Sequence, residues 1–292
     1  MLFAALVTVI TIVQTAVPSV TPLRVMPVGD SLTAIPHYRS LLLELASTNG
    51  FAIELVGPTK DGARGGHAGM SGASIEQVSQ AMKANLDLAK PNVVLLMVGT
   101  NNMNHGLGLN GAQAEGYPRD AEGHARAAMF AEPLNGSYLN GVGQRWGDPT
   151  YGTTYLAGQL DKIIEVIATH DTEVRVVIST IPPVATGALE HASNNENCSR
   201  RITEYNALIA AAAKRAAERY PGRITAVDPF TNVQRGYGVP PRSDFGPELD
   251  QRSDWVHPKP DSPVWKSIAN EFYAAFKAPS TTRPVGNGGG QR

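Results

Sequence analysis

Short apolar segments alternate with amphipathic ones along this chain, and the short segments predict the strands of a sheet. Each is of strand length and contains Val, Ile or Leu, and most have Gly, Pro or Asn within two residues. The segment at residues 92–98 is apolar from residue 93 onward. A continuous apolar run is expected of a strand that is buried on both faces of a parallel sheet. We predict strands at residues 24–29, 51–56, 92–98, 174–178 and 224–227.

The amphipathic segments predict helices, because apolar residues recur in them with helical spacing. Ser74 and Gln77 form a capping-box pattern at the start of one helix, and Pro91 ends it. Asn49 and Gly50 close an earlier helix. We predict helices at residues 38–45, 74–90, 156–167, 206–217 and 263–276.

Strands and helices alternate throughout, which predicts an α/β fold: a three-layer α/β/α domain around a parallel sheet of about five strands. We expect this one domain to occupy residues 21–279. Within it, residues 57–72 are rich in Gly and are predicted to form a loop over the sheet edge. Residues 103–154 are predicted to be a long insertion beside the site, and residues 280–292 a disordered tail.

Residues 1–20 are almost wholly apolar and contain no Lys or Arg. This composition favours a cleaved signal peptide and therefore a secreted protein. The run is also near the lower length limit for crossing a bilayer, so a retained membrane anchor is one alternative. A buried N-terminal element is another.

Composition and charge narrow the range of partners. The chain of 292 residues has a net charge of −1 and no basic stripe, which argues against a nucleic-acid partner. Cys198 is the only cysteine, which excludes an intrachain disulfide and a cysteine-based zinc cluster. We expect no metal, no cofactor, a monomer, and no stable membrane association unless the N-terminal run is retained.

A candidate nucleophile lies just after the first predicted strand. Ser31 comes after Gly29 and Asp30, at the carboxyl end of that strand, where open α/β folds place their chemistry. A serine hydroxyl needs a base to take its proton and an acid to orient the base. Asp254 lies three residues before His257, so that one loop could present both side chains. We predict Ser31, Asp254 and His257 as catalytic residues.

Two further residues are candidates for an oxyanion hole. Gly72 lies in the predicted loop at the sheet edge, and Asn101 follows the buried strand at 92–98. Because the carboxyl ends of parallel strands share one edge, the backbone N–H groups of Ser31 and Gly72 and the amide of Asn101 can converge on one oxygen.

Four residues are candidate substrate contacts: Asp30, His67, Trp146 and Trp255. Asp30 precedes the nucleophile, and His67 lies on a loop near the predicted site. Trp146 in the long insertion and Trp255 beside the base would offer flat apolar faces to a sugar ring. Packing of Trp255 against the last helix is an equally good interpretation.

Three other sequence patterns lack the structural context that their usual function requires. Ser71 lies in a sequence that approaches the G-x-S-x-G elbow, but the final glycine and a preceding strand are missing. Residues 106–111 satisfy G-x-G-x-x-G without following a strand or opening an apolar helix, so they do not predict a dinucleotide site. The histidines lack metal-binding spacing.

The four sequence blocks of one family occur here in order: residues 29–32, Gly72, residues 99–101 and residues 254–258. The chain thus resembles the SGNH (GDSL) hydrolases, and within them the carbohydrate esterases of family three, which include acetylxylan esterases. The resemblance implies a flavodoxin-like fold and metal-free serine hydrolysis. It also implies that Ser31, Gly72, Asn101 and His257 are the four lettered residues, with Asp254 completing the triad. Asn102 departs from the pattern, since many members carry Asp there.

The expected function is removal of small acyl groups, most of all acetyl, from a carbohydrate through an acyl-enzyme on Ser31. One alternative is a lipid or lysophospholipid esterase, or a thioesterase, on the same triad. A second alternative is a non-catalytic carbohydrate-binding protein of the same fold.

Overall fold

The computed structural model describes residues 21–104, 149–182, 192–230, 257–258 and 260–278. The predicted signal peptide, most of the predicted insertion and the predicted tail lie outside these residues. In the part of the chain that the structure describes, no helix is both long enough and apolar enough to cross a bilayer.

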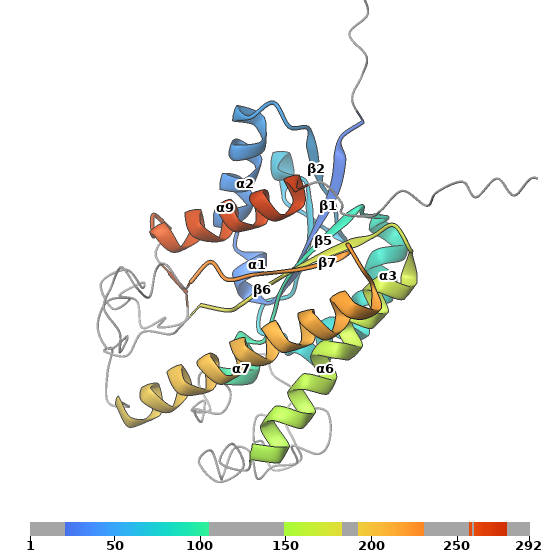
Figure 1. The fold of residues 1–292 in the computed structure, drawn as a ribbon. Coiled ribbons are helices and arrows are strands. Elements are labelled where there is room, and N and C mark those ends of the chain that lie inside the picture. The colour runs from blue at the N-terminus through green and yellow to red at the C-terminus, as the bar shows by residue number, and fades with distance from the viewer. Residues whose placement is uncertain (1–20, 105–148, 183–191, 231–256, 259, 279–292) are drawn as a thin grey trace, which may run out of the picture.

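The five predicted strands are all present and lie parallel to one another in one sheet (Figure 1). Their order is β2-β1-β5-β6-β7, which is the 2-1-3-4-5 order of flavodoxin-like sheets. The fold expectation is therefore confirmed. Their bounds are β1 (Leu23–Gly29), β2 (Ile53–Leu55), β5 (Val93–Met97), β6 (Arg175–Ser179) and β7 (Ile224–Val227).

Among the described residues the sheet has seven strands, two more than the five that we predicted. Two short strands, β3 (Thr59–Lys60) and β4 (Gly66–Gly69), lie where we predicted only a loop. β4 runs parallel to the end of β1, beyond the stretch that β2 occupies, and β3 pairs with β4 in an antiparallel hairpin. β3 has only two polar residues, and β4 has two glycines in four residues, so neither has an apolar period that the sequence pattern could reveal.

Helices cover both faces of the sheet, which confirms the three layers (Figure 1). On one face α2 packs against α9, and on the other α6 lies between α3 and α7. Ser74 caps α3 as predicted, with its N–H donating to Oε1 of Gln77. The bounds are α2 (His37–Thr48), α3 (Ile75–Ala89), α6 (Pro149–His170), α7 (Ala192–Arg219) and α9 (Pro263–Lys277).

Two helices extend well beyond their predicted starts. α6 begins at Pro149, inside the segment predicted as an insertion, and α7 begins at Ala192 rather than at residue 206. The added turns contain few large apolar residues, so no helical period marked them. The two helices as wholes pack against each other, and such packing supplies most of the stability of a helix.

Two short helices follow strands at the carboxyl edge of the sheet. α1 (Ser31–Ala34) follows β1, and α4 (Thr100–Asn104) follows β5. The ends of β1 and β5 lie very close together at Gly29. A Cβ there would collide with the carbonyl oxygen of Met97 on β5. The two chain segments that follow the strands therefore emerge side by side.

Candidate active site

Ser31 is the first residue of α1, immediately after the end of β1. Asp30 is the N-cap of this helix, and its side chain accepts a hydrogen bond from the backbone N–H of Leu32. Such a cap satisfies one of the free N–H groups that begin every helix. The strand end and the cap together set the position of the serine.

His257 meets Ser31 across 226 positions of sequence. Its Nε2 lies 2.7 Å from the hydroxyl oxygen Oγ, which is hydrogen-bonding distance. His257 is half-buried, and the next residue, Pro258, is buried. The structure thus brings together the predicted nucleophile and the predicted base.

Three of the predicted site residues lie outside the described residues. They are Asp254, Trp146 and Trp255. Asp254 stays a prediction as the partner of His257, and the two tryptophans stay predictions as sugar contacts.

Asp30 has a role that differs from the predicted substrate contact. Its side chain is fully buried, and its two carboxylate oxygens accept from the N–H groups of Leu32 and Thr100, at 3.1 and 3.2 Å. It therefore joins the segment after β1 to the segment after β5. Burial raises the pKa of the Asp30 carboxyl to about 6, although these N–H groups and the charge of His257 favour the ionised form.

Gly72 lies in the turn between β4 and α3 and is partly exposed. Its φ of +77° is in the left-handed region, which glycine adopts without steric cost. The turn is held on both sides, because Met70 N–H donates to the carbonyl of Gly29 and Ala73 N–H donates to that of Met70. This glycine is therefore anchored to the end of β1, next to the serine.

Asn101 reaches the same turn from the other side. Its side-chain amide nitrogen donates to the carbonyl of Ala73 at 2.9 Å. An amide nitrogen carries two hydrogens, so one such bond leaves the second available to a substrate. The structure thus brings Asn101 against the residue that follows Gly72, and both predicted oxyanion donors adjoin one turn.

The contacts of Asn102 explain why an amide stands where the family resemblance leads us to expect an aspartate. Its carbonyl oxygen accepts from Ile75 N–H at 2.9 Å, and its amide nitrogen donates to the carboxylate of Glu76 at 3.2 Å. Both side chains are buried. An aspartate could accept from Ile75 but would meet Glu76 as a second carboxylate, so the amide fits this environment.

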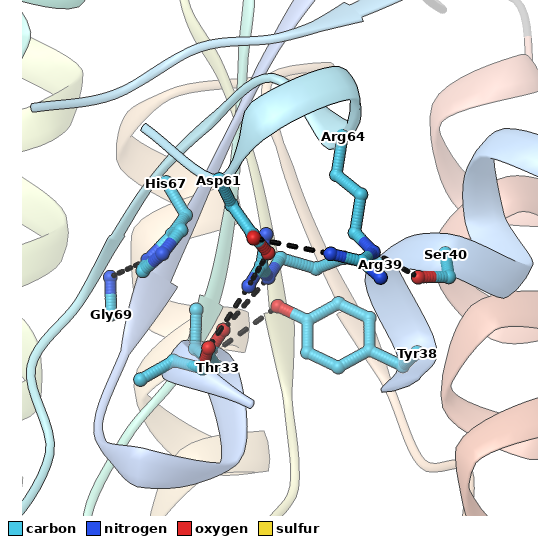
Figure 2. A network of polar contacts seen from close by, with 9 residues as sticks. Thr33, Tyr38, Arg39, Ser40, Asp61, Arg64, His67 and Gly69 are labelled. Atoms are coloured by element: carbon cyan, nitrogen blue, oxygen red, sulfur yellow. Dashed lines mark hydrogen bonds and ion pairs between the residues drawn. The ribbon is translucent and has the colours of Figure 1, made fainter. Parts of the chain in front are cut away.

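His67 does not occupy the position that we expected. Its side chain is buried on β4, and its Nδ1 accepts a hydrogen bond from the N–H of Gly69 (Figure 2). Burial, together with the charge of Arg39, lowers the pKa of the imidazole. These contacts fit a structural role in β4, which lies between β3 and β1, not the substrate contact that we predicted.

Sequence reasoning missed Thr100 and Glu76, and it gave Asn102 no role. The contribution of Thr100 is a backbone N–H, which no side-chain motif reveals. Glu76 lies one residue after the apolar Ile75 at the start of α3, where an acid is ordinary because of the helix dipole. In the part of the chain described, no three His, Cys, Asp or Glu side chains are grouped to bind a metal.

The buried Asp30 predicts a specific dependence of stability on pH. Its pKa rises from 3.8 to about 6 on folding, so the native state binds this proton more tightly. The resulting stabilisation is complete below pH 4 and is lost as pH rises through 6, amounting to about 3 kcal/mol at most. Asp30→Asn should lack it. Urea unfolding of both proteins from pH 4 to pH 7 measures the difference. Parallel curves would contradict the assignment, and the exposed Asp87→Asn serves as the control.

The Asn102–Glu76 contact predicts coupling between two substitutions. At neutral pH, Asn102→Asp should reduce the free energy of unfolding by about 3 kcal/mol, because two buried carboxylates would face each other. Adding Glu76→Gln should recover most of this loss, since a glutamine amide can donate to the carboxylate introduced at position 102. A double-mutant cycle by urea unfolding measures the coupling. Additive effects of the two substitutions would show that the side chains do not interact.

A comparison with protein families agrees with this geometry. Residues 28–261 match the model of the GDSL-like lipase/acylhydrolase family. The matched segment begins just before Ser31 and ends just after His257. No curated protein matches the chain in sequence.

Solved structures of similar fold include several esterases. A family 3 carbohydrate esterase from Clostridium thermocellum is 20% identical, with a TM-score of 0.55 over 87% of this chain and 94% of that one. A family 3 esterase from Talaromyces cellulolyticus is 18% identical, with a TM-score of 0.56 over 87% and 96%. An acetyl xylan esterase is 19% identical, with a TM-score of 0.51 over 87% and 99%.

At these identities the solved structures establish the shared fold, and the family match carries the assignment. That match spans most of the chain and includes the serine and histidine that meet at the sheet edge. The protein therefore belongs to the GDSL-like lipase/acylhydrolase family and is a carboxylic-ester hydrolase.

Proposed function

We propose that the protein is a serine esterase that removes small acyl groups, above all acetyl, from a carbohydrate. The observation that carries the proposal is the 2.7 Å contact between Ser31 Oγ and His257 Nε2. Two side chains so distant in sequence come into hydrogen-bonding range at the edge where α/β folds place their chemistry. This pairing of a hydroxyl and an imidazole is the arrangement that activates a serine.

In the first half of the reaction, Ser31 attacks the carbonyl carbon of the ester. Its hydroxyl proton passes to His257 as Oγ bonds to that carbon. When the tetrahedral intermediate collapses, His257 returns the proton to the leaving sugar oxygen, and an acyl-serine remains. Asp254 has the role of holding the imidazole in the correct tautomer and stabilising its charged form.

In the second half, water hydrolyses the acyl-serine. His257 takes a proton from the water as its oxygen attacks the acyl carbon, then returns a proton to Ser31 as the acid leaves. The oxyanion of each intermediate is stabilised by the N–H groups of Ser31 and Gly72 and the amide of Asn101. Each such donor contributes about 3 kcal/mol in acyl-transfer enzymes. The anchored turn at Gly72 and the Asn101 bond to Ala73 support these roles.

The proposed substrate class comes from the proteins of similar fold. The solved structures of similar fold include family 3 carbohydrate esterases and an acetyl xylan esterase, which favours an acetylated sugar. We propose that the protein is secreted, because residues 1–20 favour a signal peptide and a polysaccharide substrate is met outside the cell. The monomeric state stays a prediction. Trp146 and Trp255 remain candidates for stacking on the sugar.

The nucleophile and the base can be tested together. A fluorophosphonate should form an adduct that peptide mapping locates at Ser31, and Ser31→Ala should abolish it. His257→Ala should lower kcat on p-nitrophenyl acetate by several orders of magnitude, because no group would then take the hydroxyl proton. His170→Ala, at the far end of α6, is the matched control and should have wild-type activity. An adduct on another residue would remove the assignment of Ser31.

The acyl group can be tested by chain length. Acetyl esters of p-nitrophenol should be hydrolysed much faster than octanoyl esters, because a short acyl group needs no apolar channel. Acid release from acetylated xylan, pectin, chitin oligomers and a lysophospholipid then identifies the natural class. Faster cleavage of the long esters and of the lysophospholipid would favour the lipid esterase, and no release from any substrate would favour a non-catalytic binding protein.

A further inference from the structure

A fully buried arginine binds the end of the helix that begins at Ser31. Arg39 lies on α2, and its guanidinium donates from Nε to the carbonyl of Thr33 and from Nη2 to that of Ala34, both at 2.9 Å (Figure 2). Thr33 and Ala34 are the last residues of α1. The arginine therefore caps the carboxyl end of this one-turn helix.

The same guanidinium is paired with a carboxylate from the edge of the sheet. Arg39 Nη2 lies 3.1 Å from Oδ2 of Asp61, in the segment between β3 and β4 (Figure 2). Arg64, on the 3-10 helix η1 (Gly62–Arg64), pairs with the other oxygen of Asp61 at 3.1 Å and also donates to Ser40 on α2. Burial opposes the ionisation of Asp61, yet the two guanidinium groups outweigh it and hold its pKa below the usual value.

A helix as short as α1 cannot hold its shape alone. Four residues form too few internal bonds to repay the ordering of one turn, and the carbonyls at its end have no partner within the helix. Asp30 supplies a carboxylate at the amino end, and Arg39 supplies a cation at the carboxyl end. Each charge has the sign that the helix dipole favours.

Stability alone does not explain a charge in this position. The buried guanidinium must lose its water, while its partner Asp61 stays partly exposed, so their ion pair repays little of that cost. In addition, Nη1 of Arg39 is buried and makes no hydrogen bond to any part of the chain that the structure describes. A long apolar side chain would avoid both costs but could not bind two carbonyls in fixed geometry. The specific effect of the guanidinium is to orient α1.

We propose that Arg39 is a positioning residue, which holds α1 so that Ser31 Oγ faces His257 Nε2. This inference rests on the proposed function, since it matters only if Ser31 is the nucleophile. Asp61, in the edge hairpin formed by β3 and β4, contributes by fixing the position of the guanidinium. A displacement of the serine by about 1 Å would reduce the rate on the order of 100-fold.

Arg39→Lys tests the proposal, because an ammonium keeps the charge but cannot present the planar fork that binds both carbonyls. We expect kcat on p-nitrophenyl acetate and the rate of fluorophosphonate labelling at Ser31 to fall together, by about 100-fold. KM should change little, since Arg39 is buried away from substrate. Urea unfolding should stay cooperative, which shows that the variant is folded.

Arg223→Lys is the matched control. The guanidinium of Arg223 also donates to carbonyls at a helix end, but at that of α6: Ala168 in the last turn, and Asp171 and Val174 just after it. Its replacement should lower stability without changing the labelling rate at Ser31. A general loss of stability would therefore affect both variants, whereas loss of orientation would affect only Arg39→Lys.

Asp61→Asn provides a second variant if Arg39→Lys does not fold. It keeps both bonds from Arg39 to α1 but weakens the hold on the guanidinium, so labelling should slow by about tenfold. Wild-type labelling and kcat in folded Arg39→Lys, or in Asp61→Asn where the former does not fold, would overturn the proposal. Failure of the wild-type protein itself to label at Ser31 would instead refute the proposed function.

Discussion

The candidate site depends on a single turn of helix that is held by a buried charge at each end. The Asp30 carboxylate accepts from the N–H of Leu32 in the first turn, and Arg39 donates to the last two carbonyls. Neither interaction is notable as a source of stability, because burial of a charge consumes most of what the contact contributes. Their effect is directional. A serine on so short a helix would otherwise sample many orientations, and a hydroxyl must have one orientation to share its proton with His257.

The parallel sheet makes the rest of the site possible. Its strands end along one edge, so segments after β1, β4 and β5 emerge together although they are far apart in sequence. Asp30 links the first and third of these segments through Thr100, and Met70 links the second to Gly29. The site is thus a property of the sheet edge, cross-linked by a few polar contacts.

Around the predicted oxyanion donors, the contacts of Asn102 show why an amide suits a position where many family members carry an aspartate. Asn102 replaces the aspartate that many members carry, and Glu76 faces it from α3. An amide can accept from Ile75 and donate to the carboxylate at once, which an aspartate cannot do. The pair joins α4, which carries Asn101, to the helix that follows Gly72. The two donors therefore belong to one connected unit.

Local sequence determined much of this protein. The apolar run of β5, the capping box of α3 and the Gly-Asp-Ser turn after β1 are short-range signals, and they predicted the alternating fold and the edge where Ser31 lies. The partner of Ser31, His257, was predicted from a different observation, which is the order of the four family blocks along the chain.

Only the tertiary structure decided what each polar side chain does at that edge. Asp30 and His67, which we expected to contact substrate, are buried and make structural hydrogen bonds. Arg39 binds the end of the helix that begins at Ser31. A weak signal existed, because Arg39 shares one face of α2 with the buried Leu42 and Ala46. Its partners, however, are carbonyls on another helix and a carboxylate from the edge hairpin. Contacts of this kind depend on distances in space, which spacing along the chain does not encode.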